Sequence, residues 1–339
     1  METIRCIFCQ NAGEDRAVIE ENGFTGRKCS RCGLVYISPR PSRSEMMELY
    51  THDQSHISAE RHLKDSFIKR IYARHHLAII RRYIKDGSLL EIGAGAGYFL
   101  DEARKKGFGV FGLEPNPIQA EFMNRYLRIP CDSRTLSEAY ENQTFDIIYH
   151  CDVISHFYDP FQEFSLMNSR LKPHGYVIFE TGNGDFHRKY YADFSSFQYP
   201  DHLFFFNERN IQMLLRRTGF ELLAMYRYSL LPQLKISKFM RPWLRKKEEW
   251  AGGEKGPKEI QGVDSDLSYV LKRSQGLKNI IRNGASLFFY VLRYKIGSFF
   301  PKIQRPYTFI VIARKFQEVS ARTKPSPDDQ QNEKCVLPG

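Results

Sequence analysis

The feature that constrains this chain most is a glycine-rich turn between a short apolar strand and a helix. The segment reads LLEIGAGAGYFL and contains Glu91, Gly93, Gly95 and Gly97. Glycines at this spacing let the backbone turn tightly and approach a nucleoside-bearing cofactor closely. In the dinucleotide-binding fingerprint G-x-G-x-x-G/A, the last glycine or alanine lies one position later than Gly97 does here. The spacing therefore disfavours a dehydrogenase.

A second acidic residue follows at a distance that suits a nucleoside site. Glu114 stands seventeen residues after Gly97, directly after the apolar run FGVFGL. A doubly wound fold places the end of its second strand beside the glycine turn. A carboxylate there can accept hydrogen bonds from both ribose hydroxyls. The alternative is a solvated turn residue, since Pro115 and Pro117 follow it.

The length and composition of the chain limit the classes of protein to which it can belong. A chain of 339 residues is long enough for two or three folded units, and 42% hydrophobic residues suffice for a core. We expect no membrane-spanning helix, because no run of eighteen apolar residues occurs. The start METIRCIFCQ lacks the basic and apolar regions of a secretory signal. Seven cysteines without such a signal indicate a reducing, cytoplasmic setting rather than a disulfide scaffold.

Four cysteines near the beginning of the chain have the spacing of a zinc ribbon. Cys6 and Cys9 form one C-x2-C pair, and Cys29 and Cys32 form another. Two such pairs can supply four thiolates to a tetrahedral, structural zinc ion. We expect residues 1–40 to form this unit, with the metal supplying much of its folding free energy. Four buried free cysteines are the alternative.

The rest of the chain predicts helices first and then an alternation of strands and helices. Residues 41–86 read as a helical linker or cap, with Ser44 as a helix cap and surface histidines that include His75 and His76. From residue 88 the alternation predicts an α/β fold with a parallel sheet. The expected strands are 89–92, 109–113, 129–131, 145–150, 176–181, 221–230 and 308–315. The expected helices follow the glycine turn and cover 118–126, 159–171 and 211–217.

This pattern resembles the class I S-adenosylmethionine (SAM) methyltransferases. G-x-G-x-G after an acidic residue resembles their motif I, and FDIIYHCDVISHFYDP resembles their fourth strand and its turn. The block PDHLFFFNERNIQMLLRRTGFEL is similar to one found in a large subgroup. The resemblance covers residues 80–230 and 307–315. It implies a Rossmann-like seven-stranded sheet, formed by residues 87–232 with 306–316, whose last strand is antiparallel and lies between the fifth and sixth.

The resemblance also implies a cofactor site. Its residues would be the glycine turn with Glu91, then Glu114 for the ribose, Thr135 and Leu136 near the adenine, and Asp152 in the turn after the fourth strand.

Catalytic candidates follow from the same resemblance. His156 could accept a proton, although many relatives have Glu-His where this chain has Ser155-His156. A zinc ribbon before this domain resembles bacterial sugar and secondary-metabolite methyltransferases, which carry a Tyr-His-Glu-His cluster. The comparable residues here are Tyr199, Asp201 and His202, with proline in place of one histidine. The alternatives are a packing histidine at 156 and a structural turn at 200–202. We expect Asp185, His187, Tyr190 and Tyr191 to line the acceptor pocket.

The charge of the chain is concentrated in one insertion. The net charge is +11, and residues 235–305 alone hold sixteen Lys or Arg against six Asp or Glu. We expect residues 233–305 to form a basic helical insertion before the last strand, and residues 317–339 to be a disordered tail. Residues 277–300 have the composition of an interfacial helix, which predicts peripheral contact with an anionic membrane, at its inner face in a cytoplasmic setting. A helical pair packed on the domain is the alternative.

These observations favour a SAM-dependent methyltransferase that acts on a glycan, glycolipid or related small molecule. An RNA methyltransferase is the second hypothesis, supported by the zinc ribbon and the positive charge. Against it, HCDVIS stands where base amino-methyltransferases have Asn/Asp-Pro-Pro-Tyr/Phe. A non-catalytic SAM-binding scaffold is the third hypothesis. The identity of the acceptor, the atom methylated and the oligomeric state stay open.

Overall fold

The computed structural model describes residues 1–10, 15–51, 63, 65–185, 198–237, 239, 277–300 and 307–316. The expectations for His187, Tyr190, Tyr191 and the tail 317–339 lie outside these residues, as does most of the insertion before residue 277. The domain boundaries expected from the sequence stay predictions.

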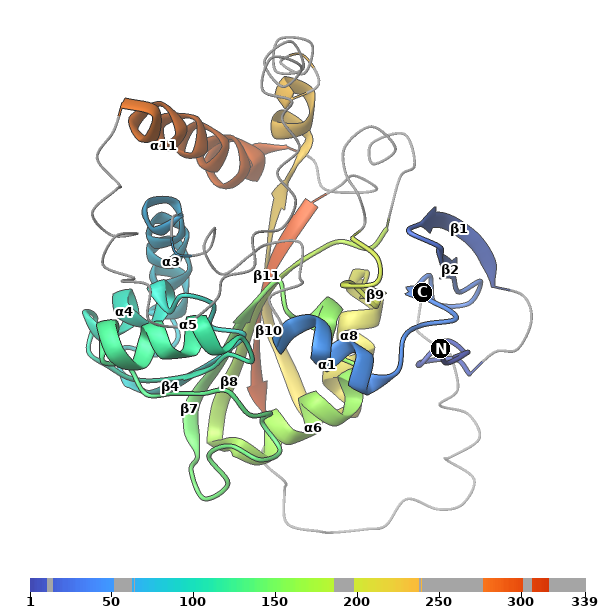
Figure 1. The fold of residues 1–339 in the computed structure, drawn as a ribbon, viewed down its shortest axis with the longest axis horizontal. Coiled ribbons are helices and arrows are strands. Elements are labelled where there is room, and N and C mark those ends of the chain that lie inside the picture. Colours follow the sequence, from blue (N-terminus) through green and yellow to red (C-terminus); the bar gives the residue numbers. More distant parts are fainter. Residues whose placement is uncertain are drawn as a thin grey trace.

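A seven-stranded sheet forms the centre of the molecule (Figure 1). Its order is β10-β11-β8-β7-β4-β5-β6. Strands β8, β7, β4, β5 and β6 are parallel, and β11 is antiparallel to both of its neighbours. The strands are β4 (Gly87–Ile92), β5 (Phe108–Leu113), β6 (Cys131–Asp132), β7 (Phe145–Cys151), β8 (Leu171–Gly182), β10 (Phe220–Ser229) and β11 (Tyr307–Lys315). This order confirms the expected Rossmann-like methyltransferase sheet.

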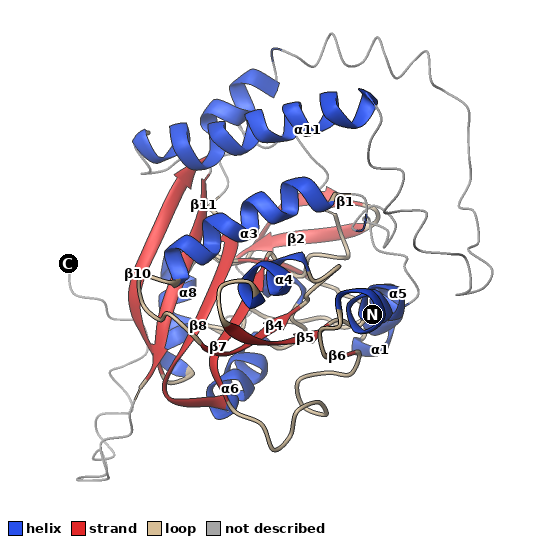
Figure 2. Ribbon diagram, turned by 90° about the vertical axis from the view of Figure 1, so that its left-hand side faces the viewer, coloured by secondary structure: helices blue, strands red, loops and turns tan. Residues whose placement is uncertain are grey.

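Helices cover both faces of this sheet (Figure 2). One layer holds α3 (Ser66–Ile80) and α4 (Tyr98–Arg104), and the other holds α6 (Pro160–Arg170) and α8 (Glu208–Arg217). Successive residues of one strand point to opposite faces, so Ile147 packs with the first layer and Ile148 with the second. Shorter elements are α1 (Arg43–Thr51), α5 (Pro117–Phe122), the π-helical turn η1 (Met123–Leu127) and the 3-10 turn η2 (Ile154–His156).

The cysteine-containing region forms a second sheet that includes a strand from far along the chain. Its order is β1 (Arg16–Glu21), β2 (Phe24–Lys28), β3 (Val35–Ile37) and β9 (Phe204–Phe205). Val35 pairs with Phe205 and Tyr36 with Phe204. Its buried residues belong to the same hydrophobic cluster as α6 and α8. The ribbon is thus joined to the central domain through backbone pairing and a common core.

The described end of the insertion lies across α3. It consists of α11 (Leu277–Tyr290), the π-helical turn η4 (Val291–Ile296) and the 3-10 turn η5 (Gly297–Phe299). Figure 2 shows α11 along the outer edge of the molecule, above α3. Among the described residues, no helix is long and apolar enough to cross a membrane.

Two expectations about the helical region are wrong. Helix α1 begins at Arg43, and Ser42 caps it instead of Ser44: the Ser42 hydroxyl accepts from the Glu45 amide, and the Glu45 carboxylate accepts from the Ser42 amide. His76 is not a surface residue but is 2% exposed. Its place on the inner stripe of α3 could not be separated from the outer stripe by spacing alone, because a histidine suits either.

Candidate functional site

The glycine turn connects β4 to α4 with three left-handed residues. Gly93, Gly95 and Gly97 have φ angles of 68°, 55° and 71°, which side chains other than hydrogen disfavour. A Cβ on Gly93 would lie 2.7 Å from Val153, and one on Gly97 would lie 2.5 Å from Met123. Both strain and crowding therefore require glycine at these two positions. The turn lies at the carboxyl end of the parallel strands, where ligands bind in such sheets.

Glu114 lies directly against this turn. One carboxylate oxygen accepts from the Gly95 amide at 2.7 Å, and the other accepts from the Asn116 amide at 3.0 Å. Burial raises the pKa of Glu114, while these two backbone donors act in the opposite direction. Each oxygen keeps a further lone pair, so the carboxylate can still accept from a ribose. Glu114 therefore contacts the glycine turn directly, and its role as the ribose acceptor stays a prediction.

A second buried carboxyl group and a lysine lie beside it. Glu91 is 5% exposed, and its Oε2 atom has no hydrogen-bond partner among the described residues. Burial raises the pKa of Glu91 well above its usual value. Burial also lowers the pKa of Lys69, on α3, to about 8, although Glu91 and Glu114 are among the groups that oppose this shift. An orphaned buried oxygen beside an ammonium suits a zwitterionic ligand with one amino and one carboxylate group.

The other residues expected at the cofactor lie around the same edge. Thr135 uses its hydroxyl locally, bonding Ser137 at 2.7 Å and Glu138 at 3.1 Å, and Leu136 is 3% exposed. Asp152 follows β7 with a φ of 55°, an uncommon conformation for this residue type. Desolvation of its carboxyl group and the neighbouring Glu180 carboxylate raise the pKa of Asp152 to about 6.

His156 and Asp201 form a pair, although forty-five residues separate them. The Nδ1 atom of His156 lies 3.1 Å from Oδ1 and 2.9 Å from the backbone oxygen of Asp201. Both Asp201 atoms can only accept, so this nitrogen carries the proton and Nε2 is left as the acceptor. The Tyr50 hydroxyl of α1 donates to the same backbone oxygen at 3.0 Å. Many relatives have a glutamate at the position of Ser155. In this chain Asp201 places a carboxylate beside His156 instead.

The ribbon holds the segment that carries Asp201. Leu203 donates its amide to the Ser155 oxygen at 2.8 Å and accepts from the Ile37 amide at 3.1 Å. The next residues form β9 against β3. His202 faces His156 with ring centroids 4.6 Å apart. Tyr199 is 2% exposed, and a Cβ on Gly26 of β2 would meet its hydroxyl at 2.2 Å. The Tyr199 side chain therefore packs on the ribbon.

A buried ionic network around Glu180 also neighbours Asp152. Glu180 of β8 is 1% exposed and accepts from Arg293 and Tyr294 of η4, each at 2.7 Å. His76 lies 2.5 Å from it through Nε2, and its Nδ1 lies 2.5 Å from the Tyr149 hydroxyl. Charged and hydrogen-bonded neighbours hold the pKa of Glu180 low, against the effect of burial. This network attaches the insertion to the carboxyl end of the sheet.

The four ribbon cysteines converge as their spacing predicts. One sulfur from each of Cys6, Cys9, Cys29 and Cys32 lies within 4.8 Å of the others, and the Cys6 and Cys32 sulfurs are 3.4 Å apart. The backbone oxygen of Cys32 accepts from Asn207 at 3.0 Å, at the start of α8. Four clustered thiols suit a structural zinc ion.

Two other groups of described residues have candidate ligand atoms within the same range: His76 with Cys151 and Glu180, and His156 with Asp201 and His202. In the first group Arg293 already neutralises the carboxylate. In the second, Nδ1 of His156 lies 3.1 Å from the Asp201 carboxylate and 2.9 Å from the Asp201 backbone oxygen.

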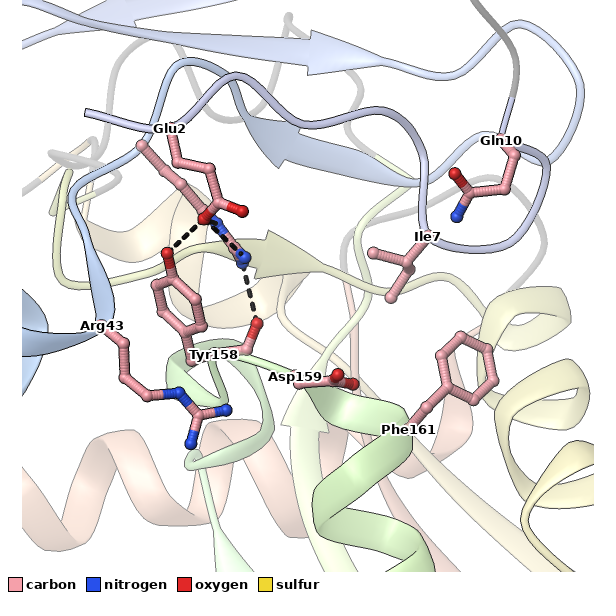
Figure 3. Close-up of a pocket in the computed structure, with 8 residues that line it drawn as sticks. Glu2, Ile7, Gln10, Arg43, Tyr158, Asp159 and Phe161 are labelled. Atoms are coloured by element: carbon pink, nitrogen blue, oxygen red, sulfur yellow. Dashed lines mark hydrogen bonds and ion pairs between the residues drawn. The ribbon is translucent and has the colours of Figure 1, made fainter.

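A pocket of about 340 Å³ lies elsewhere, between the first residues of the chain and α6 (Figure 3). Within it Arg40 donates to Glu2 at 3.2 Å and covers the ring of Tyr158 at 3.7 Å. Its lining contains none of the expected cofactor or catalytic residues: it consists of Glu2, Ile7, Gln10, Arg40, Arg43, Tyr158, Asp159 and Phe161. The pocket marks the junction of the ribbon with α6.

Comparison with known families decides what the central domain is. Residues 63–225 match the family described as a methyltransferase domain. This part of the chain has a class I methyltransferase fold. This match covers the glycine turn, Glu114, and the His156–Asp201 pair, and it excludes the ribbon and the insertion. The expected family resemblance is therefore confirmed for the central domain.

Individual relatives are distant from this methyltransferase domain. A tRNA U34 carboxymethyltransferase from Helicobacter hepaticus is 27% identical over 131 residues, which cover 34% of this chain and 40% of that protein. A SAM-dependent methyltransferase from Archaeoglobus fulgidus has 17% identity and a TM-score of 0.41, covering 73% of this chain and 94% of its own. A Haemonchus contortus phosphoethanolamine N-methyltransferase, solved with S-adenosylhomocysteine, has 18% identity and a TM-score of 0.43, covering 72% and 53%.

Several residues at the methyltransferase site were not identified from the sequence. Lys69 and Tyr50 lie in the helical region, where no motif distinguishes them from other helix residues. Glu180 sits in the apolar strand YVIFET, where a lone acid indicates burial with a partner but does not name it. Arg293 lies in the segment for which an interfacial helix and a packed helical pair were both open, and it is turned inward to Glu180.

Proposed function

We propose that this protein transfers the methyl group of SAM to a glycan, glycolipid or related small molecule. The observation that carries the proposal is the contact of Glu114 with the glycine turn, in a domain that matches a methyltransferase family. The proposed acceptor would lie at the carboxyl edge of the sheet, between Asp152 and the His156–Asp201 pair.

The residues around the turn suit the parts of SAM. Glu114 would accept from the ribose hydroxyls, and Thr135 and Leu136 would lie near the adenine. Glu91 has an unpartnered oxygen for the amino group, and the Lys69 ammonium would pair with the carboxylate. The turn itself would let the backbone approach the ligand closely, and Asp152 would lie near the sulfonium charge.

SAM supplies an electrophilic methyl group on a sulfonium, so the protein must align a nucleophile and remove its proton. We propose His156 as the base. The new bond joins the methyl carbon to the acceptor atom, the sulfur keeps the electrons of the broken bond, and the acceptor proton passes to Nε2 of His156. Asp201 holds the proton on Nδ1 and stabilises the imidazolium that results. His202 would help to position the acceptor, and a catalytic role for Tyr199 would require its hydroxyl to leave Gly26.

We propose that the four ribbon cysteines bind zinc with a structural role. Four thiolates leave no open coordination position. The metal would stabilise β2 and β3, to which β9 is attached, and would thereby fix Asp201 and His202.

A second candidate is methylation of RNA. It is favoured by the tRNA-modifying relative and by the net charge of +11. RNA binding of this kind would weaken steeply as salt is raised. A non-catalytic SAM-binding role is less favoured, because Asp201 replaces the carboxylate that position 155 lacks.

The test is release of S-adenosylhomocysteine from SAM in the presence of separate acceptor pools. The pools are sugar nucleotides, extracted glycolipids and bulk tRNA. Turnover with either of the first two supports the proposal, whereas turnover with tRNA alone supports the second candidate. SAM binding without turnover on any pool would favour the scaffold.

A further inference from the structure

The exposed side of residues 284–299, within the described part of the insertion, is apolar, which is the reverse of an ordinary surface helix. A helix on a soluble domain places its apolar stripe inward and polar residues outward. From residue 284 to 299 the exposed positions recur every three or four residues, so they form one stripe. They are Gly284, Ala285, Leu287, Phe288, Val291, Lys295, Ile296 and Phe299. Five of the eight are large hydrophobic residues, and Phe299 is 87% exposed.

Contacts on the buried side of the same residues fix the orientation of the helix and so keep the stripe in solvent. Leu292 and Tyr294 are 4% and 3% exposed, and Tyr294 packs against His75 with ring centroids 4.5 Å apart. Arg293 is paired with the buried Glu180. A Cβ on Gly297 would lie 2.5 Å from a backbone oxygen of Ser229, so η5 sits directly on β10. Rotating the helix would expose a buried carboxylate without its partner, which is strongly unfavourable.

The charged residues in the sequence of this segment all have the same sign. Residues 277–302 contain no Asp or Glu, and their basic residues are Lys278, Arg282, Arg293, Lys295 and Lys302. Arg293 is neutralised inside by Glu180, whereas Lys295 is exposed within the stripe. An apolar stripe that contains an exposed lysine, in a segment whose sequence has no acidic residue, matches the composition of helices that lie in a bilayer interface.

We propose that this face, the stripe from Gly284 to Phe299, docks on the surface of a bilayer with anionic headgroups. The stripe is about 22 Å long at the rise of a helix, and Figure 2 places α11 along the outer edge of the molecule. The side chains of Phe288 and Phe299 enter the interface while Lys295 contacts the headgroups. A second copy of the chain suits the face less well, because a two-fold contact would bring the cations of both copies together.

The test is co-sedimentation of the full chain with vesicles of neutral phosphatidylcholine, or of phosphatidylcholine with roughly a third phosphatidylglycerol. The anionic vesicles should bind at least about tenfold more tightly, and salt should weaken the binding. The double variant Phe288→Ser/Phe299→Ser should lose about tenfold or more, and Lys295→Gln about fivefold. The control Phe316→Ser changes an exposed phenylalanine next to the opposite end of β10 and should bind as the unsubstituted chain does.

Three results would overturn the proposal. Equal binding to neutral and anionic vesicles would show that anionic headgroups are not recognised. Unchanged binding of the double variant would show that the stripe does not contact the bilayer. A dimer in the absence of lipid that the double variant dissociates would assign the face to a second copy. Circular dichroism and SAM binding of each variant show whether the fold is kept, and both variants alter only exposed side chains. The vesicle-binding result does not depend on whether a methyl acceptor is found.

Discussion

The cofactor half and the acceptor half of the site are built in different ways. On the cofactor side, the glycine turn and Glu114 lie within twenty-two residues and touch through the Gly95 amide. On the acceptor side, His156 meets Asp201 from a segment that the ribbon holds, and Asp152 lies beside a network completed by the insertion. The first half is a local motif, whereas the second is assembled from four distant parts of the chain. Changes in the ribbon or in residues 199–206 should therefore affect turnover more than SAM affinity.

We expect the largest effect from a substitution of Asp201, which should lower turnover without changing SAM affinity. We expect Asp201→Asn to lower turnover by about 100-fold or more, because it removes the carboxylate charge, 3.1 Å from Nδ1 of His156, that would stabilise the imidazolium. The backbone oxygen of residue 201 still accepts from Nδ1 in this variant. Calorimetry should find SAM affinity within about twofold of the unsubstituted chain, since Asp201 lies outside the cofactor half. The control Asp86→Asn alters an exposed aspartate at the opposite end of β4. Full turnover by Asp201→Asn would mean that the pair is only structural.

The converse change is Glu114→Ala on the cofactor side. Two charge-assisted hydrogen bonds to the ribose are together worth about 3 kcal/mol, so SAM should bind about 100-fold more weakly. The measurement is calorimetric titration with SAM. Glu121→Ala on α5 removes a half-buried carboxylate that pairs with the exposed Arg125 and should leave the affinity unchanged. A loss of less than about threefold in Glu114→Ala would remove the ribose assignment.

The ribbon gives a test of how far the two halves are independent. If the ribbon binds zinc as proposed, Cys32→Ser should weaken that binding and loosen β3 with β9, because metal binding contributes several kcal/mol to the folding of such units. Hydrogen exchange should accelerate in residues 199–206 but remain slow in β4 and β5. Equal protection of 199–206 in both proteins would show that the ribbon does not hold Asp201. Substitution of the exposed Ser30 by Ala, between the second pair of cysteines, is the matched control.

The smallest expected effect is the pH dependence of SAM binding through Lys69. Its pKa is lowered to about 8, so the cation is present below pH 8 and is lost as the pH rises through that value. If Lys69 pairs with the SAM carboxylate, the affinity should fall by up to about tenfold between pH 7 and pH 9. Lys69→Met should bind more weakly and lose this dependence. A flat profile in the unsubstituted chain would place the carboxylate elsewhere.

The sequence predicted the cofactor half far better than the acceptor half. The strands around the glycine turn were found within two residues, because short apolar runs and glycines report local backbone geometry directly. The pairing of His156 with Asp201 was not predicted. It depends on β9 joining β3, a contact between residues about 170 apart that neither pattern nor spacing encodes. For the same reason the pairing of Arg293 with Glu180 was not predicted, since the two residues lie 113 positions apart.

The most direct test is calorimetric titration of the zinc-loaded full chain with SAM, with NAD as the comparison ligand. The account predicts one SAM site per chain, which Glu114→Ala weakens about 100-fold, and no binding of NAD. Binding of NAD in preference to SAM, or no binding of SAM at all, would contradict it.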